Sequence, residues 1–207
     1  EMLDDIARRN LDESLASTPG AYGEDRQHLI ARYGSLDQFK QNIQVSQMLA
    51  TDNYGATPLH YAVLGANIPI LNWILDQSIN IDVTDNEGRS ALHYAAALRN
   101  TLIVVDLLQR GANPSLMDKQ SNVPLHYAAE SGSIEIIDSL LEAAPEAISK
   151  INQESLQPLD AAILRGNVDT ARELIRRGAS KDGWDPMQDP PIFRATEATC
   201  NRGEMLA

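Results

Sequence analysis

Four histidines are the residues best suited in this chain to hold a metal ion or move a proton. His28, His60, His93 and His126 are separated by 32, 33 and 33 positions. Neighbouring packed helices place equivalent residues roughly 8–10 Å apart, whereas zinc ligands converge within about 2 Å of one ion. The spacing therefore predicts histidines with structural roles and argues against a shared metal site.

The other reactive residues lack the neighbours that catalysis needs. Cys200 is the one cysteine, and no histidine outside the regular spacing could activate it. The chain contains no Gly-x-x-x-x-Gly-Lys-Ser/Thr, Gly-x-Gly-x-x-Gly or Gly-x-Ser-x-Gly segment. The acidic pairs Asp4/Asp5 and Asp12/Glu13 are typical of solvated charge. We expect no catalytic residue, no metal and no cofactor.

The elements that position the histidines are copies of one short unit. Segments beginning at Gly55, Gly88, Ser121 and Ser155 align, and their leucines fall at 59, 92, 125 and 159. Weaker copies surround residues 28 and 191. In the first full copy, Thr57 is suited to cap a helix whose first residue is Pro58. A second, apolar helix follows in each copy, and Gly111 and Gly178 end two of these helices.

This period, with segments such as Thr57-Pro58-Leu59-His60, resembles the ankyrin repeat. The resemblance implies an all-α solenoid of stacked helix-turn-helix units with short hairpin tips. In it His60, His93 and His126 are structural hydrogen-bonders, and Thr57 and Pro58 belong to the same structural repeat motif. It predicts an amphipathic helix and linker at 1–24, a degenerate repeat at 25–51, full repeats at 52–84, 85–117, 118–151 and 152–184, and a partial repeat at 185–207.

Several positions depart from the repeat. Arg99 stands where a glycine is expected between helices, and Asp160 replaces the repeat histidine. Trp73 occupies a second-helix position that is polar in the other copies. It either packs against the irregular first repeat or anchors a partner. The equivalent tyrosines Tyr61, Tyr94 and Tyr127 form a ladder that indicates packing between repeats.

Composition narrows the class of partner. The 207 residues carry a formal net charge of −12, which disfavours nucleic acid. The uncharged stretch 53–75 is interrupted by Asn, Gly, Pro and His, so no membrane insertion is expected. A single cysteine fits an intracellular protein, cytoplasmic or nuclear. The 118–151 segment has six acidic and two basic residues, which favours a basic partner there.

The resemblance also implies where a protein partner binds, namely the concave face and hairpin tips of a stack that we expect to be monomeric. Candidate positions on the first helices are Leu64, Leu98, Glu130 and Arg165, and Ala56 lies with the tips. The predicted partner-binding tip residues are Asn53, Tyr54, Asn86, Glu87, Arg89, Lys119, Gln120, Asn122, Gln153, Glu154 and Leu156.

The sequence is compatible with two hypotheses about function. The first is a protein–protein interaction module without catalysis of its own. The alternative is a regulatory or substrate-recruiting ankyrin segment of a larger multidomain enzyme, suggested by a chain that opens without Met and stops within a repeat. The apolar spacing over residues 1–20 predicts a helix that either caps the stack or binds a partner.

Overall fold

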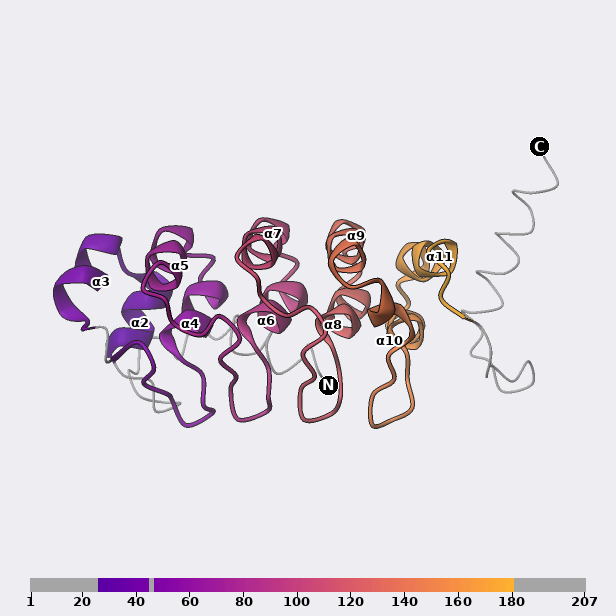
Figure 1. The fold of residues 1–207 in the computed structure, drawn as a ribbon, viewed down its shortest axis with the longest axis horizontal. Coiled ribbons are helices and arrows are strands. Elements are labelled where there is room, and N and C mark those ends of the chain that lie inside the picture. Colours follow the sequence, from indigo (N-terminus) through magenta and orange to yellow (C-terminus); the bar gives the residue numbers. More distant parts are fainter. Residues whose placement is uncertain (1–25, 45–46, 181–207) are drawn as a thin grey trace.

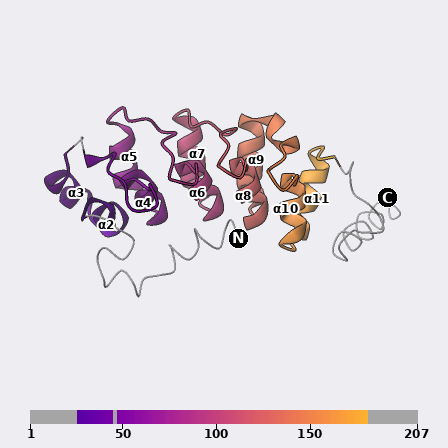
Figure 2. The same cartoon turned by 90° about the horizontal axis from the view of Figure 1, so that it is seen from below.

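The computed structural model describes residues 26–44 and 47–180, and these form one row of stacked helical units (Figure 1). From residue 52 onward each unit has a hairpin, a first helix and a second helix, with the hairpins projecting from one side of the row. The second helices form one row and the first helices form another, which lies between the second helices and the hairpins (Figure 1), and Figure 2 shows the same stack from below. The helices are α2 (Arg26–Tyr33), α3 (Leu36–Asn42), α4 (Pro58–Leu64), α5 (Ile68–Leu75), α6 (Ala91–Ala97), α7 (Thr101–Gln109), α8 (Pro124–Ser131), α9 (Ile134–Ala143), the 3₁₀ helix η3 (Pro145–Ser149), α10 (Pro158–Leu164) and α11 (Val168–Arg176).

The first helices begin with the same local exchange of hydrogen bonds. In α4 the ring Nδ1 of His60 accepts the backbone N–H of Thr57 at 3.1 Å, and Pro58 is the first helical residue. Val123 lacks a side-chain oxygen, yet its N–H still donates to Nδ1 of His126 at 3.2 Å. Asp160 does the same work in α10, where Oδ2 accepts the N–H of Gln157 at 2.6 Å. The repeat therefore tolerates the loss of its capping threonine.

The second helices contribute most of the large aliphatic side chains of the core. Ile103, Val104 and Leu107 of α7 are buried, as are the equivalent residues of α9. The predicted stops are confirmed at Gly111 and Gly178, whose φ angles are +89° and +98°. The turns between helices also need the left-handed region, because Arg99 takes φ +59° at the place where a glycine was expected.

An aspartate or asparagine closes every full hairpin. Oδ1 of Asp118 accepts the N–H groups of Gln120 and Asn122 at 2.9 and 2.8 Å, and Asp118 N–H donates to the carbonyl of Asn122. Successive hairpins are joined by backbone bonds, such as Lys119 N–H to the carbonyl of Glu87 at 2.8 Å. The hairpins consequently form a continuous edge along the stack.

The histidines of the full repeats join each unit to the next. Because Nδ1 accepts a hydrogen bond, Nε2 carries the ring hydrogen, and in His60 it donates to the carbonyl of Arg89 at 3.1 Å. His93 and His126 reach Asn122 and Leu156 in the same way. His28 is equally buried and bonds the carbonyl of Ala50 at 3.0 Å. Hydrogen bonds thus account for all four rings, between units for His60, His93 and His126 and within the α2–α3 unit for His28.

Trp73 is partly buried and packs against the α2–α3 unit. Its ring lies 5.6 Å from that of Phe39 in an edge-to-face arrangement, with Phe39 in the core and Trp73 packed against it. The alternative in which Trp73 anchors a partner finds no support in this packing, which follows the irregular shape of the α2–α3 unit.

Candidate functional site

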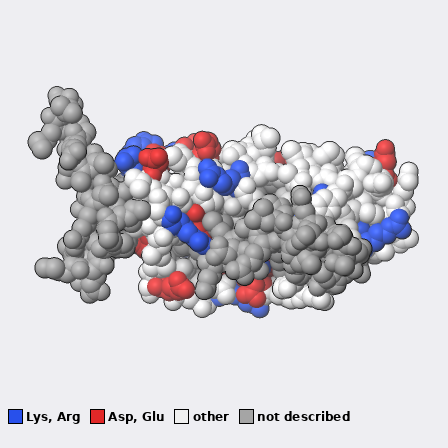
Figure 3. Space-filling model, turned by 180° about the vertical axis from the view of Figure 1, so that it is seen from behind, with Lys and Arg blue, Asp and Glu red and all other residues white. Residues whose placement is uncertain are grey.

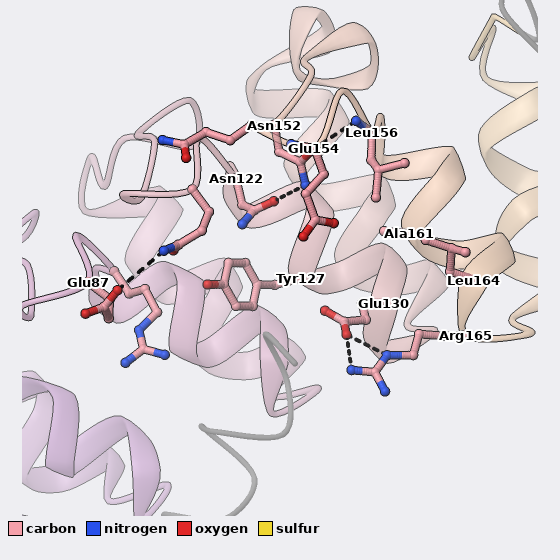
Figure 4. A pocket seen from close by; sticks show the side chains of 13 residues that line it. Glu87, Asn122, Tyr127, Glu130, Asn152, Glu154, Leu156, Ala161, Leu164 and Arg165 are labelled. Carbon is pink, nitrogen blue, oxygen red and sulfur yellow. Dashed lines mark hydrogen bonds and ion pairs between the residues drawn. The ribbon is translucent and has the colours of Figure 1, made fainter.

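A hollow of about 890 Å³ opens on the inner face of the stack, between the hairpins and the first helices α8 and α10 (Figure 4). The Asp118 and Asn152 hairpins form one wall and the helices form the other. Its lining mixes carboxylate, amide, aromatic and aliphatic groups. These residues are Glu87, Arg89, Gln120, Asn122, Tyr127, Glu130, Asn152, Gln153, Glu154, Leu156, Ala161, Leu164 and Arg165.

The hollow coincides with a break in the tyrosine ladder. Tyr61, Tyr94 and Tyr127 each donate from the hydroxyl to the hairpin aspartate nine residues earlier, at 2.9, 2.8 and 2.7 Å. In the last unit Ala161 takes the tyrosine position and Asn152 takes the aspartate position. The last unit therefore lacks both the ring and the buried Tyr–Asp bond of the preceding units, and Ala161 lines the hollow together with Tyr127.

Tyr127 borders this space as a fixed hydrogen-bonding group. Its ring packs edge-to-face on His93 with the centroids 5.5 Å apart. Burial, reinforced by the carboxylate of Asp118, raises the pKa of Tyr127 above its ordinary value. The hydroxyl therefore remains protonated and keeps donating to Asp118.

Glu130 lies at the floor of the hollow with one oxygen engaged. Oε1 accepts from Nε of Arg165 at 2.5 Å, and the second guanidinium nitrogen also contacts it. Oε2 is buried and has no hydrogen-bond partner among the described residues. Figure 4 shows this pair below Tyr127, with Arg165 reaching in from the end of α10. A buried carboxylate oxygen without a donor carries a desolvation cost that a bound donor group would relieve.

Arg89 faces the hollow but is committed to the fold. It is 4% exposed, and its guanidinium pairs with Asp85 at 2.8 Å and lies over the ring of Tyr94. Burial works to raise the pKa of Asp85, but the charge and hydrogen bonds of Arg89 outweigh it, so that pKa is lowered. The expectation that Arg89 is an exposed tip residue is wrong.

Other residues in the second half of the hairpin were also expected to be exposed but are buried. Ala56 and Asn122 are 0% and 1% exposed, because each backbone closes on the residue four positions earlier. Leu64, expected on the inner surface, is also buried at 5% exposure. Leu156 is partly exposed and borders the hollow. Leu98 is partly buried against the core.

The outer ends of the hairpins are exposed, as expected. Of these residues, Glu87, Gln120, Gln153 and Glu154 border the hollow. The remaining exposed tip residues lie outside its lining and are Asn53, Tyr54, Asn86 and Lys119.

Three lining residues, Asn152, Ala161 and Leu164, were not predicted from the sequence, and for Tyr127 the sequence favoured packing over a binding role. The signal was available in the alignment, because Ala161 interrupts the tyrosine ladder in register. Glu130 and Arg165 were expected on the inner face, but their pairing across the units was not.

The histidines provide no reactive group at this site. Burial lowers the pKa of His60 and of His93 to about 4, despite nearby aspartates that act to raise it. Both rings are therefore neutral near pH 7 and serve as donor and acceptor at once. Within the part of the chain that the structure describes, no group of three or more His, Cys, Asp or Glu side chains is arranged to hold a metal ion.

Charges elsewhere are dispersed. On the face opposite that of Figure 1, acidic and basic side chains are interspersed among larger uncharged areas (Figure 3). On the second helices, Arg110 joins Asp76 and Asp106 at 2.8 and 3.0 Å, and Arg177 pairs with Asp138. No helix between residues 26 and 180 has the length and apolar character required to cross a bilayer.

Three expectations fall outside the described residues. They concern the helix over residues 1–20, the partial repeat at 185–207 and the surroundings of Cys200.

The hairpin-helix-helix units, joined by buried histidines, define a helical repeat protein of the solenoid class. A family model described as ankyrin repeats (3 copies) matches residues 27–118 and 96–185, which together cover most of the chain. The chain belongs to the ankyrin repeat family. A comparison with curated proteins found no match. Ankyrin repeats are generally protein–protein interaction modules, and the family is typically non-catalytic.

Proposed function

We propose that this protein is a non-catalytic interaction module that binds a segment of a partner protein in the hollow between the Asp118 and Asn152 hairpins. The observation that carries the proposal is the break in the ladder at Ala161. Ala161 lines a hollow of about 890 Å³ that lies beside polar groups at the inner face of an otherwise regular stack. Concave sites with a few placed polar groups are the usual form of binding sites.

The rest of the stack serves this site as a rigid support. The lining comes from three hairpins and two helices, so no single unit could form it. Backbone bonds between hairpins and the histidine bonds between units hold these parts in register. Binding therefore requires little ordering of the protein, which reduces its entropic cost.

Refilling the ladder tests the proposal. The double variant Asn152→Asp, Ala161→Tyr restores the pair present in the three preceding units and should place a ring inside the hollow while leaving the stack folded. Leu102→Tyr is the matched control, because it adds the same ring at a 73% exposed position of α7. Proteins captured from a lysate by the wild-type chain and by Leu102→Tyr should be absent with the double variant. Equal capture by all three folded proteins would reject the hollow as the binding surface.

A further inference from the structure

The chemistry of the hollow points to a particular kind of partner. Glu130 is 6% exposed and its Oε2 has no donor among the described residues. An ionised carboxylate only accepts hydrogen bonds and has about four lone-pair sites, of which Arg165 uses those on Oε1. The unfilled requirement at this position is a hydrogen-bond donor, and a cationic donor would meet it most strongly.

The rim carries charge of the same sign. Glu87 and Glu154 are exposed carboxylates on the hairpins that border the hollow. Of the two lining cations, Arg89 is neutralised by the buried Asp85 and Arg165 by Glu130. The potential at the opening is therefore negative, and the chain as a whole carries −12. This disfavours both an acidic partner and a second copy of the chain.

An aliphatic surface lies next to the carboxylate. Leu164 is 62% exposed at the end of α10, and Arg165 follows it directly. In Figure 4 Leu164, Arg165 and Glu130 lie together on one side of the hollow. Arginine and lysine have an aliphatic stem below a charged head, so one such side chain can contact both kinds of surface.

Building on the proposed function, we propose that the hollow recognises an arginine or lysine side chain of a partner peptide. The charged head donates to Oε2 of Glu130 while Arg165 stays on Oε1, and the stem lies along Leu164. Glu87 and Glu154 attract basic segments to the opening. Because Arg165 and the guest share one carboxylate, they repel each other, so Arg165 weakens binding.

Two peptide pools test this directly. Each is a fluorescent seven-residue peptide with a fixed central residue, Arg in one pool and Glu in the other, flanked by mixed Ala, Leu, Ser and Gly. Fluorescence anisotropy with the full chain should show at least tenfold tighter binding of the Arg pool. A third pool with central norleucine reports a neutral occupant. Equal binding of the norleucine pool, or tighter binding of the Glu pool, would overturn the proposal.

Three variants separate recognition from folding. Glu130→Gln should weaken binding of the Arg pool about tenfold or more, whereas Arg165→Gln should strengthen it several-fold. Glu142→Gln removes the same charge from an exposed position of α9 outside the lining and should leave binding unchanged. Unfolding would weaken binding by both variants, whereas the proposal expects them to change the affinity in opposite directions. Weaker binding of the Arg pool by Arg165→Gln would therefore contradict the claim that Arg165 and the guest share the Glu130 carboxylate. If the Asn152→Asp, Ala161→Tyr variant loses partner capture but the wild-type chain binds the Arg pool no more tightly than the other pools, the hollow remains the proposed binding surface. The proposal that it recognises a basic side chain is then rejected.

Discussion

The hydroxyl of Tyr127 donates a 2.7 Å hydrogen bond to Oδ2 of Asp118, and the last described unit has Ala161 and Asn152 in the same two places. In the three preceding units this bond joins the first helix to its hairpin. Where both partners have changed, Asn152 turns to its neighbour and donates to Oδ1 of Asn122 at 2.9 Å. The hairpin thus stays fixed although the last unit lacks the tyrosine ring.

The Tyr–Asp bond should contribute measurably to stability. Tyr127→Phe leaves a buried carboxylate oxygen with one donor fewer, which should lower the free energy of unfolding by about 1–2 kcal/mol. Urea denaturation followed by circular dichroism gives the value. Tyr33→Phe, at a 51% exposed ring, is the control and should change stability by less than about 0.5 kcal/mol. Similar losses for both would show that the buried bond contributes little.

Arg89 should prove to be a stability residue. Arg89→Ala leaves Asp85 buried without its cation, which should cost about 3 kcal/mol. Arg110→Ala removes two pairs on the outer face, where the side chains are 31–63% exposed, and should cost less than about 1 kcal/mol. Denaturant melts of the two variants compare the cost directly. An Arg89→Ala protein as stable as the Arg110→Ala protein would show that the buried Arg89–Asp85 pair contributes no more to stability than the exposed pairs.

The neutral histidines predict a loss of stability on mild acidification. An unfolded histidine has an ordinary pKa of 6.5, whereas in the fold the pKa of His60 and of His93 is about 4. Between these values the unfolded chain binds protons that the folded chain does not, so stability falls as pH drops from about 6.5 to 4. Below pH 4 these two rings cause no further loss.

Comparing unfolding at pH 7 and pH 5 tests this effect. The wild-type chain should lose a few kcal/mol over the interval, of the order that two such shifted pKa values imply. His93→Gln should be less stable at pH 7 but should lose less between the two pH values. An unchanged difference in that variant would mean that other groups control the acid response.

Arg99 offers a stabilising change. Its φ of +59° is costly for a side chain with a Cβ, and glycine takes this conformation freely. Arg99→Gly should raise the free energy of unfolding by up to about 1 kcal/mol, even though it loses a long 3.5 Å contact to the carbonyl of Gly132. Arg99→Lys keeps the strain and should leave stability unchanged. A glycine variant less stable than the lysine variant would refute strain at this turn.

The sequence predicted most of the fold because the repeat fixes each element by position. The spacing of His60, His93 and His126 indicated packing between units, and Gly111 and Gly178 marked helix ends correctly. The residue before the helix predicted capping less well. Val123 and Gln157 are not capping residues, yet their backbone N–H groups still donate to the side chains of His126 and Asp160, three positions later.

The candidate site was only partly predictable. The alignment placed Glu87 and Glu154 on exposed hairpin ends, but it also treated Arg89 and Asn122 as tips. They are buried because the hairpin backbone closes between residues four positions apart and because the Arg89 side chain bonds back to Asp85. The repeat spacing alone predicts neither contact. The hollow is lined by Ala161, at the position where the preceding units have a tyrosine. The sequence shows this substitution but not the open space around it.

The most direct test of the account is to locate a captured partner on the protein by NMR. In the spectrum of the isotopically labelled chain, the amide signals of Tyr127, Glu130 and Ala161 should shift or broaden most on titration, with smaller changes along α7 and α9. The Asn152→Asp, Ala161→Tyr variant should show no such changes at equal concentration. Perturbations concentrated on the outer helices, with the signals around the hollow unmoved, would contradict the claim that this protein binds its partner at the break in the tyrosine ladder.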